Sequence, residues 1–204
     1  MKHLVVYVHG KGGSANEAEH YKPLFDRCEV VGFDYRAQTL WEAREEFPRF
    51  FEQQRANCDS LTLIANSIGA FFSMTSLSGK QIDRALFISP VVDMERLIEG
   101  MMARANVTED ELHDRKEITT EYGETLSWDW LDDVRNHPLQ WAVPTRILYG
   151  NRDFLTPPET MSTFAARIGA TLTVMPGGEH WFHTPDQMAF LDRWVGESMR
   201  QFEP

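Results

Sequence analysis

The chain has 204 residues, 42% of them hydrophobic and 12% aromatic, which is typical of one globular domain with a sizeable core. Its formal net charge of −11 disfavours a nucleic-acid partner, because phosphate binding requires a basic surface. Cys28 and Cys58 lack the spacing of a metal site, so we expect reduced thiols, no metal and a cytoplasmic protein. The N-terminal apolar run is too short for a transmembrane helix and lacks a signal-peptide cleavage region, so no membrane partner is expected.

The first half of the chain alternates predicted strands with predicted helices. Short apolar runs predict strands at residues 3–10, 29–35, 60–66 and 84–90. Helical patterns predict helices at residues 14–27, 39–57 and 68–79. Ser14 and Glu17 form a capping box that begins the first of these helices, and Gly79 is expected to end the third. Pro48 is expected to kink or interrupt the second, because proline lacks a backbone N–H.

The second half continues the alternation after one long interruption. Its predicted strands are at residues 145–150 and 171–178, and its helices are at residues 158–169 and 184–202. This order predicts an α/β fold, with a doubly wound, mostly parallel sheet and helices on both faces. Residues 91–143 hold three helix-like pieces and no predicted strand. We therefore expect a single domain, 1–204, with a helical insertion at 91–143.

Three polar residues each follow a different predicted strand. Ser67 follows the third strand, Asp153 follows the fifth and His180 follows the sixth. The carboxyl ends of parallel strands meet at one edge of a sheet, and ligands of open sheets bind beyond that edge. A serine becomes a strong nucleophile when a histidine removes its proton and a carboxylate orients the histidine. The pattern therefore predicts nucleophilic catalysis at this edge.

Four segments of the chain resemble the α/β-hydrolase family in their order and separation. The segments "HGKGGS" (9–14), "ANSIGA" (65–70), "LYGNRDFLTP" (148–157) and "PGGEHWFHTP" (176–185) resemble its oxyanion loop, nucleophile elbow, acid segment and histidine segment. Ala65 replaces the first glycine of the elbow, and its small side chain should fit the sharp turn. The chain starts at what would be the family's third strand, so the resemblance implies a six-stranded sheet in spatial order 2-1-3-4-5-6.

The resemblance also implies a role for each site residue. Ser67 would be the nucleophile, His180 its general base and Asp153 the carboxylate that orients the imidazole ring. The backbone N–H groups of Lys11 and Ile68 would stabilise the oxyanion that forms when a carbonyl is attacked.

The residues alone leave other roles open for these positions. Ser67 could be only the N-cap of a helix. His183 lies three residues after His180 and is a rival base, and Glu179 or Asp93 could replace the expected carboxylate.

We interpret the chain as a small serine hydrolase that cleaves a small or medium carboxylic ester or thioester through an acyl-enzyme, with no cofactor. Its partner would be a small-molecule acyl substrate. The same triad would serve a peptidase or amidase, and a non-catalytic ligand-binding protein of this fold is the alternative from another class. The insertion is expected to be a lid whose apolar residues line the substrate pocket, namely Met101, Met102, Trp128 and Trp130. The two tryptophans could instead form the insertion's own core.

Overall fold

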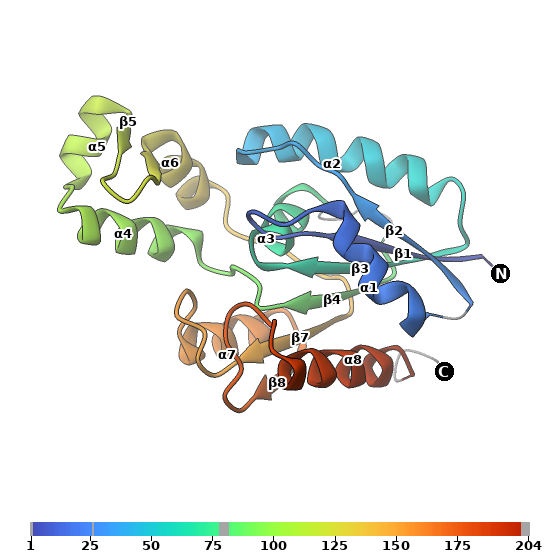
Figure 1. Ribbon diagram of the computed structural model, residues 1–204. Coiled ribbons are helices and arrows are strands. Elements are labelled where there is room, and N and C mark those ends of the chain that lie inside the picture. Colours follow the sequence, from blue (N-terminus) through green and yellow to red (C-terminus); the bar gives the residue numbers. More distant parts are fainter. Residues whose placement is uncertain (1, 26, 78–81, 201–204) are drawn as a thin grey trace. The chain divides into compact units, whose positions relative to one another are not determined.

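The computed structural model describes residues 2–25, 27–77 and 82–200 (Figure 1). The chain forms two compact units. The larger comprises Met1–Val91 and Gln140–Pro204, and the smaller is Val92–Leu139, which falls inside residues 91–143. Gly79, which was predicted to end a helix, and the last two residues of the helix predicted at 184–202 lie outside the described residues. No helix in the described ranges is both long and apolar enough to cross a bilayer.

A six-stranded sheet forms the centre of the larger unit. Its strands are β1 (His3–Val8), β2 (Cys28–Phe33), β3 (Ser60–Asn66), β4 (Arg84–Ile88), β7 (Thr145–Gly150) and β8 (Thr171–Met175). Neighbours pair in the order β2-β1-β3-β4-β7-β8, and every pair in this sheet is parallel. The predicted fold class and strand order are confirmed. The central strands β1 and β3 are buried along most of their length, as expected when helices cover both faces.

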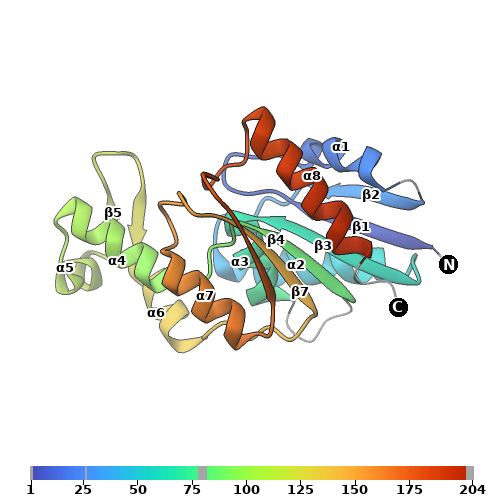
Figure 2. The same cartoon turned by 90° about the horizontal axis from the view of Figure 1, so that it is seen from below.

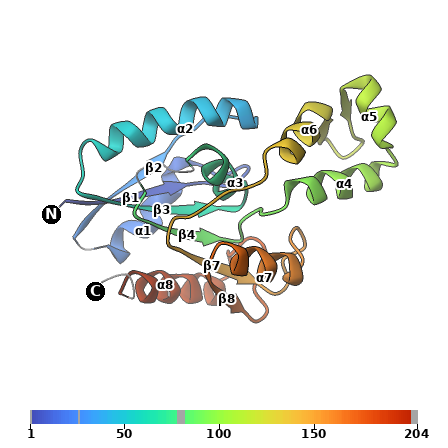
Figure 3. The same ribbon diagram turned by 180° about the vertical axis from the view of Figure 1, so that it is seen from behind.

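The helices of the larger unit lie on both faces of this sheet. They are α1 (Ala18–Tyr21), α2 (Leu40–Arg55), α3 (Ser67–Ser76), α7 (Pro158–Arg167) and α8 (Pro185–Arg200). Figure 2 shows α1 and α8 on one face and α2, α3 and α7 on the other. Figure 3 shows α2 and α3 from the opposite side.

The prediction of one continuous helix at residues 14–27 is wrong. The structure has three short pieces there: the 3₁₀ turn η1 (Ala15–Glu17), the single α-turn α1 and the 3₁₀ turn η2 (Lys22–Leu24). Pro23 is the second residue of η2 and has no N–H to donate to the carbonyl of Glu19, so an α-helix continuing from α1 would lack a hydrogen bond at this position.

Apolar side chains hold both helical layers to the sheet. Helix α2 continues through Pro48, so the interruption expected there does not occur. The helix buries Phe47 and Phe51, which are one turn apart. These two rings belong to an aromatic cluster between α2, α3 and β2, made of Phe33, Tyr35, Phe47, Phe50, Phe51 and Phe72. On the other face, Ala18 and Tyr21 of α1 and Leu191, Trp194 and Val195 of α8 pack in a core with the strands.

The smaller unit combines helices with a short hairpin. Its elements are α4 (Met94–Ala105), α5 (Glu109–Arg115), β5 (Glu117–Thr119), β6 (Thr125–Ser127) and α6 (Trp128–Asn136). The helices agree with the three helix-like pieces in the sequence. The antiparallel hairpin corrects the expectation that this stretch holds no strand. Its strands have three residues each and bury only Ile118 and Leu126 at their centres, which is too short a pattern to recognise in a sequence.

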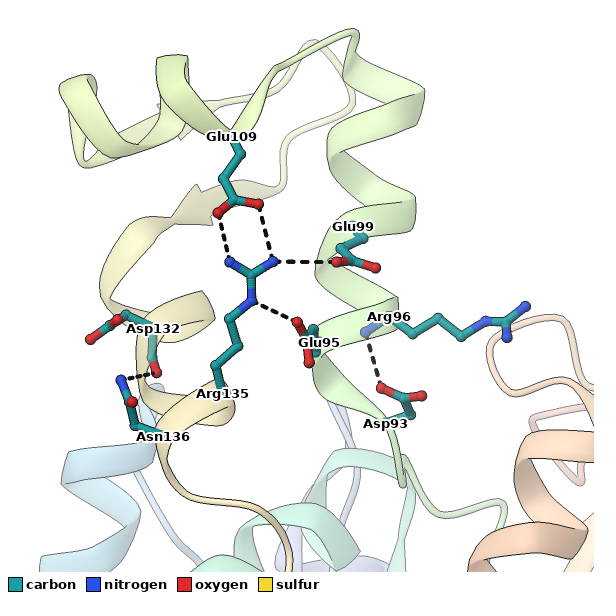
Figure 4. Close-up of polar contacts among 8 residues, drawn as sticks. All are labelled: Asp93, Glu95, Arg96, Glu99, Glu109, Asp132, Arg135 and Asn136. Atoms are coloured by element: carbon teal, nitrogen blue, oxygen red, sulfur yellow. Dashed lines mark hydrogen bonds and ion pairs between the residues drawn. The ribbon is translucent and has the colours of Figure 1, made fainter.

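Arg135 on α6 connects the helices of the smaller unit through carboxylates (Figure 4). Its Nε donates to Glu95 on α4 at 2.6 Å, and its Nη1 and Nη2 donate to the two oxygens of Glu109 on α5 at 2.7 and 3.1 Å. Nη2 also lies 3.4 Å from Glu99 on α4. These hydrogen bonds raise the pKa of Arg135 above its already high usual value. The side chain is 29% exposed, so solvent screens the ion pairs only in part.

Replacing Arg135 should therefore loosen the smaller unit. We expect Arg135→Met to lower the free energy of unfolding by about 1–2 kcal/mol, because the carboxylates it bridges would then repel one another. The difference should shrink in high salt. Urea unfolding followed by tryptophan fluorescence measures it. Arg49→Met is the matched control, because Arg49 is 79% exposed and 3.8 Å from Glu45, and it should change stability by less than about 0.5 kcal/mol.

Candidate active site

Ser67 lies at the junction of β3 and α3 in an unusual backbone conformation. Strand β3 ends at Asn66, which is extended, and the helix begins at Ser67 itself. The φ angle of Ser67 is +49°, in the left-handed region that residues with a side chain rarely adopt. The backbone N–H of Val91 donates to the Ser67 carbonyl at 3.1 Å and helps to hold this turn. A strained serine between a strand and a helix is the geometry of a nucleophile elbow.

Helix α3 can lie close to the loop after β1 because Gly69 has no side chain. A Cβ atom at Gly69 would lie 2.2 Å from the carbonyl oxygen of His9, in the loop after β1. The loop that contains Lys11 therefore lies directly against the first turn of α3. The His9 ring is stacked on Tyr35 at 4.2 Å between centroids, and its Nδ1 donates to the Gly10 carbonyl at 2.8 Å. His9 therefore anchors the loop.

The three residues singled out from the sequence form one chain of hydrogen bonds. Ser67 Oγ lies 2.8 Å from His180 Nε2, and His180 Nδ1 lies 2.7 Å from Asp153 Oδ2. A carboxylate can only accept, so Nδ1 carries the proton and Nε2 presents its lone pair to the serine hydroxyl. The Asp153 side chain is fully buried, and its other oxygen accepts from the backbone N–H of Leu155 at 2.8 Å. The arrangement can therefore transfer the Ser67 proton to a histidine whose orientation is fixed.

The loops after β7 and β8 hold the carboxylate and the histidine together. The Arg152 N–H donates to the Gly178 carbonyl at 2.8 Å, and the Gly177 N–H donates to the Asn151 side chain at 2.7 Å. These bonds connect the segment that ends in Asp153 to the segment that leads into His180. They hold the pair together although Asp153 and His180 are 27 positions apart in the sequence.

The rival residues have other partners. His183 donates from Nδ1 to the Trp181 carbonyl at 2.7 Å and stacks on the Trp181 ring, and its Nδ1 is 3.6 Å from Glu179. Asp93 caps α4 in the smaller unit, where it accepts from the Arg96 N–H at 3.0 Å. The structure therefore pairs His180 with Asp153 and with neither rival carboxylate.

A cavity of about 810 Å³ opens in front of Ser67 and His180. Apolar and aromatic side chains form much of its wall: Tyr7, Tyr21, Ile88, Leu155, Trp181, Phe182, Met188 and Leu191. Lys11 and Glu17 also line it. Ile68 is in the first turn of α3, where backbone N–H groups lack acceptors within the helix. These positions suit the expected oxyanion donors, whose role stays a prediction.

Several residues of the wall were missed in the sequence. Trp181 and Phe182 directly follow His180, so their place in the histidine segment was the available signal. Glu17 was taken only as half of a capping box, and nothing in the local pattern indicates that it reaches the cavity. Among the described residues, no group of three or more histidine, cysteine, aspartate or glutamate side chains is placed to hold a metal ion.

The expected pocket residues Met101, Met102, Trp128 and Trp130 all belong to the smaller unit. Met102 is buried, and Tyr122 donates to the Met101 carbonyl at 2.7 Å. Trp128 packs against the edge of His113 at 4.6 Å between centroids, and Lys116 Nζ lies 5.7 Å from the Trp128 ring centre. These contacts of Trp128 lie within the smaller unit, and whether the two tryptophans form its core stays untested. A role for these four residues in substrate selection stays a prediction.

The close approach at Gly69 gives a direct test of the elbow. Gly69→Ala should destabilise the protein by about 1–3 kcal/mol and lower any activity of the site, because the added methyl must push back the His9 carbonyl. Gly196→Ala in α8 is the matched control. Its Cβ would make only ordinary contact, 3.7 Å from Arg200, so it should be neutral or stabilising by about 0.5–1 kcal/mol. Thermal and urea unfolding measure both, and equal effects at the two positions would contradict the elbow geometry.

Comparison with known proteins identifies the fold. No protein-family model matches the sequence, and no curated protein is significantly similar to it. Among solved structures, Est1E from Butyrivibrio proteoclasticus aligns with a TM-score of 0.78 at 16% identity, covering 98% of this chain and 88% of Est1E. Alpha/beta hydrolase domain-containing protein 10 from mouse aligns with a TM-score of 0.76 at 14% identity, covering 98% and 90%.

A third solved structure, XC6422 from Xanthomonas campestris, is described as an α/β serine hydrolase without a lid. It aligns with a TM-score of 0.66 at 17% identity, covering 99% of this chain and 83% of its own. At such low identity the likeness concerns the fold, and it covers nearly the whole chain in all three cases. The chain therefore has the α/β-hydrolase fold.

Proposed function

We propose that the protein is a serine hydrolase that cleaves a carboxylic ester or thioester through an acyl-enzyme. The observation that carries this proposal is the hydrogen-bonded series Ser67–His180–Asp153 at the carboxyl edge of the sheet. Ser67 is the nucleophile, His180 is the general base and Asp153 orients and stabilises the charged imidazole.

The chemistry proceeds in two halves. His180 Nε2 takes the proton of Ser67 as Oγ attacks the acyl carbon, and the carbonyl oxygen becomes an oxyanion. The oxyanion collapses, the bond to the alcohol or thiol breaks, and His180 returns its proton to the leaving group. A water molecule then attacks the acyl-enzyme in the same way, releasing the acid and restoring Ser67.

The oxyanion requires donors that are in place before the reaction. We assign them to the backbone N–H groups of Ile68, at the start of α3, and of Lys11, in the loop that contacts α3. The closeness of this loop to Gly69 supports the assignment, since it brings both segments to the carbonyl that Ser67 would attack. Loss of one such donor typically costs about 10²–10³ in turnover.

The backbone strain at Ser67 supports catalysis over a purely binding role. A left-handed serine costs on the order of 1–3 kcal/mol and persists only where the surroundings impose it. A ligand-binding protein of the same fold has no evident need for this strain, or for a buried carboxylate behind the histidine. Both features are expected if the serine hydroxyl must meet an acyl carbon.

The cavity and the structural neighbours support a small or medium acyl substrate. A volume of about 810 Å³ is within the range of small-molecule sites, and its aromatic wall suits an apolar group. Est1E has been solved with ferulic acid, and other neighbours are an esterase of Pyrococcus furiosus and a thioesterase domain of the curacin biosynthetic pathway.

We also place the protein in the cytoplasm, because Cys28 and Cys58 are not joined to each other by a disulfide.

The direct test of this function is hydrolysis of p-nitrophenyl esters and acyl thioesters of graded chain length. The wild type should turn over at least one of them, and Ser67→Ala should lower its turnover by about 10⁶ while keeping the fold. Circular dichroism and the unfolding midpoint check that the fold is kept. A folded wild type that cleaves no ester or thioester in the panel, or a Ser67→Ala variant with near-normal turnover, would refute the proposal.

His180 and His183 form a matched pair for the second test. His180→Ala should abolish turnover, because no other base contacts Ser67 in the described structure. His183→Ala should lower turnover at most several-fold, since this ring lines the cavity but bonds to Trp181. Steady-state kinetics on the best ester decides between them, and a greater loss in His183→Ala than in His180→Ala would overturn the choice of base.

A further inference from the structure

A second series of hydrogen bonds runs beside the nucleophile. Asn66, the residue before Ser67, donates from Nδ2 to the Tyr7 hydroxyl at 2.8 Å. The Tyr7 hydroxyl donates in turn to one oxygen of Glu17. The other Glu17 oxygen accepts from the backbone N–H of Ser14 at 3.0 Å. Asn66, Tyr7 and Glu17 all line the cavity in front of Ser67.

The direction of each bond in this series is fixed by chemistry. Tyr7 is fully buried, and its burial, the nearby Tyr21 and the Glu17 carboxylate raise the pKa of its hydroxyl far above the usual value. Tyr7 therefore stays protonated and gives its single proton to the carboxylate, which can only accept. Its lone pairs are left for the Asn66 amide, which must present its NH₂ group. Glu17 thus determines, through Tyr7, how the side chain next to Ser67 is oriented.

This orientation of the Asn66 amide is unfavourable for its side-chain oxygen. Its Oδ1 is buried and has no hydrogen-bond partner within the described residues. A buried acceptor left unsatisfied is unfavourable, because it has lost its hydrogen bonds to water. An amide that was free to rotate would turn this oxygen toward a donor. The amide orientation is therefore imposed by Tyr7 and Glu17.

The series connects the two segments that would supply the oxyanion donors. Ser14 closes the loop of residues 9–14, which contains Lys11, and Asn66 leads into Ser67 and Ile68. The Glu17 carboxylate passes directly across this loop, since a Cβ atom at Gly13 would lie 2.5 Å from Glu17 Oε1. The Glu17 carboxylate and the Tyr7 hydroxyl thus add a second connection between the two donor segments, besides the contact between Gly69 and the His9 carbonyl.

We propose that Glu17 and Tyr7 are positioning residues for the reaction at Ser67, which hold the loop of residues 9–14 at the distance from Ser67 that the oxyanion requires. This inference rests on the proposed hydrolase function. It gives Glu17 a role beyond the helix cap, because a cap needs only the bond to Ser14. The bond to Tyr7 and the fixed Asn66 amide contribute nothing to capping.

The kinetic test compares variants of the series on an ester that the wild type cleaves. Glu17→Ala and Tyr7→Phe should each lower kcat by about 10–10²-fold and leave KM within about twofold, since a displacement of about 1 Å at a reacting centre can cost 10²-fold. Glu17→Gln keeps one acceptor and should recover part of the loss. The double variant Tyr7→Phe/Glu17→Ala should lose no more turnover than the more impaired of the two single variants, because both residues act through one series of bonds.

Glu19→Ala is the matched control. Glu19 lies two residues away and is exposed, and it forms an ion pair with Lys22. It should leave kcat unchanged. An unchanged kcat in Glu17→Ala, or a loss confined to KM, would overturn the proposal, the latter because it would make Glu17 a substrate-binding group.

Hydrogen–deuterium exchange tests the coupling independently of activity. Backbone amides of residues 9–14 should exchange faster in Tyr7→Phe and Glu17→Ala than in the wild type, and as in the wild type in Glu19→Ala. Unchanged exchange of this loop in Tyr7→Phe would overturn the proposal even if turnover fell. A wild type that cleaves no ester would reject the hydrolase function, and the exchange measurement would then decide the coupling alone.

Discussion

The left-handed backbone of Ser67 is the constraint on which the rest of the site depends. The chain must leave β3 and enter α3 within one residue, and this turn presents Oγ to His180 at 2.8 Å. The first turn of α3 lies against the His9 carbonyl at Gly69, where a side chain would clash. That contact in turn fixes the loop after β1, which carries Lys11. The strained turn at Ser67 and the close contact at Gly69 thus bring the Ser67 hydroxyl together with the two segments of the proposed oxyanion donors.

Most of the fold and the central residues of the site could be predicted from the sequence. The apolar runs of β1, β3 and β4 are continuous because helices cover both faces of the sheet, and such runs are easy to recognise. Once the strands are placed, parallel alignment brings their carboxyl ends to one edge. This explains why Ser67, Asp153 and His180 could be grouped although 113 positions separate the serine from the histidine.

Other features depend on contacts that local sequence does not encode. The helix expected at 14–27 is divided into three short pieces, and Pro23, which lacks a backbone donor, lies in the last of them. The hairpin of the smaller unit has strands too short to show a pattern. The role of Glu17 was hidden for a different reason. Its spacing from Ser14 already fits a capping box, and only the fold brings the Tyr7 hydroxyl to its carboxylate. A residue that satisfies one local rule can therefore serve a second partner that only tertiary structure reveals.

We propose above all that Ser67 is an activated nucleophile in this fold. A fluorophosphonate reacts with a serine only when a base activates it, so covalent labelling measures this property without knowledge of the natural substrate. Intact mass spectrometry should show one adduct per chain, and peptide mapping should place it on Ser67, with no adduct in Ser67→Ala. A folded protein that takes up no label, or one labelled at Ser14 or Ser89 instead, would contradict this assignment of the nucleophile.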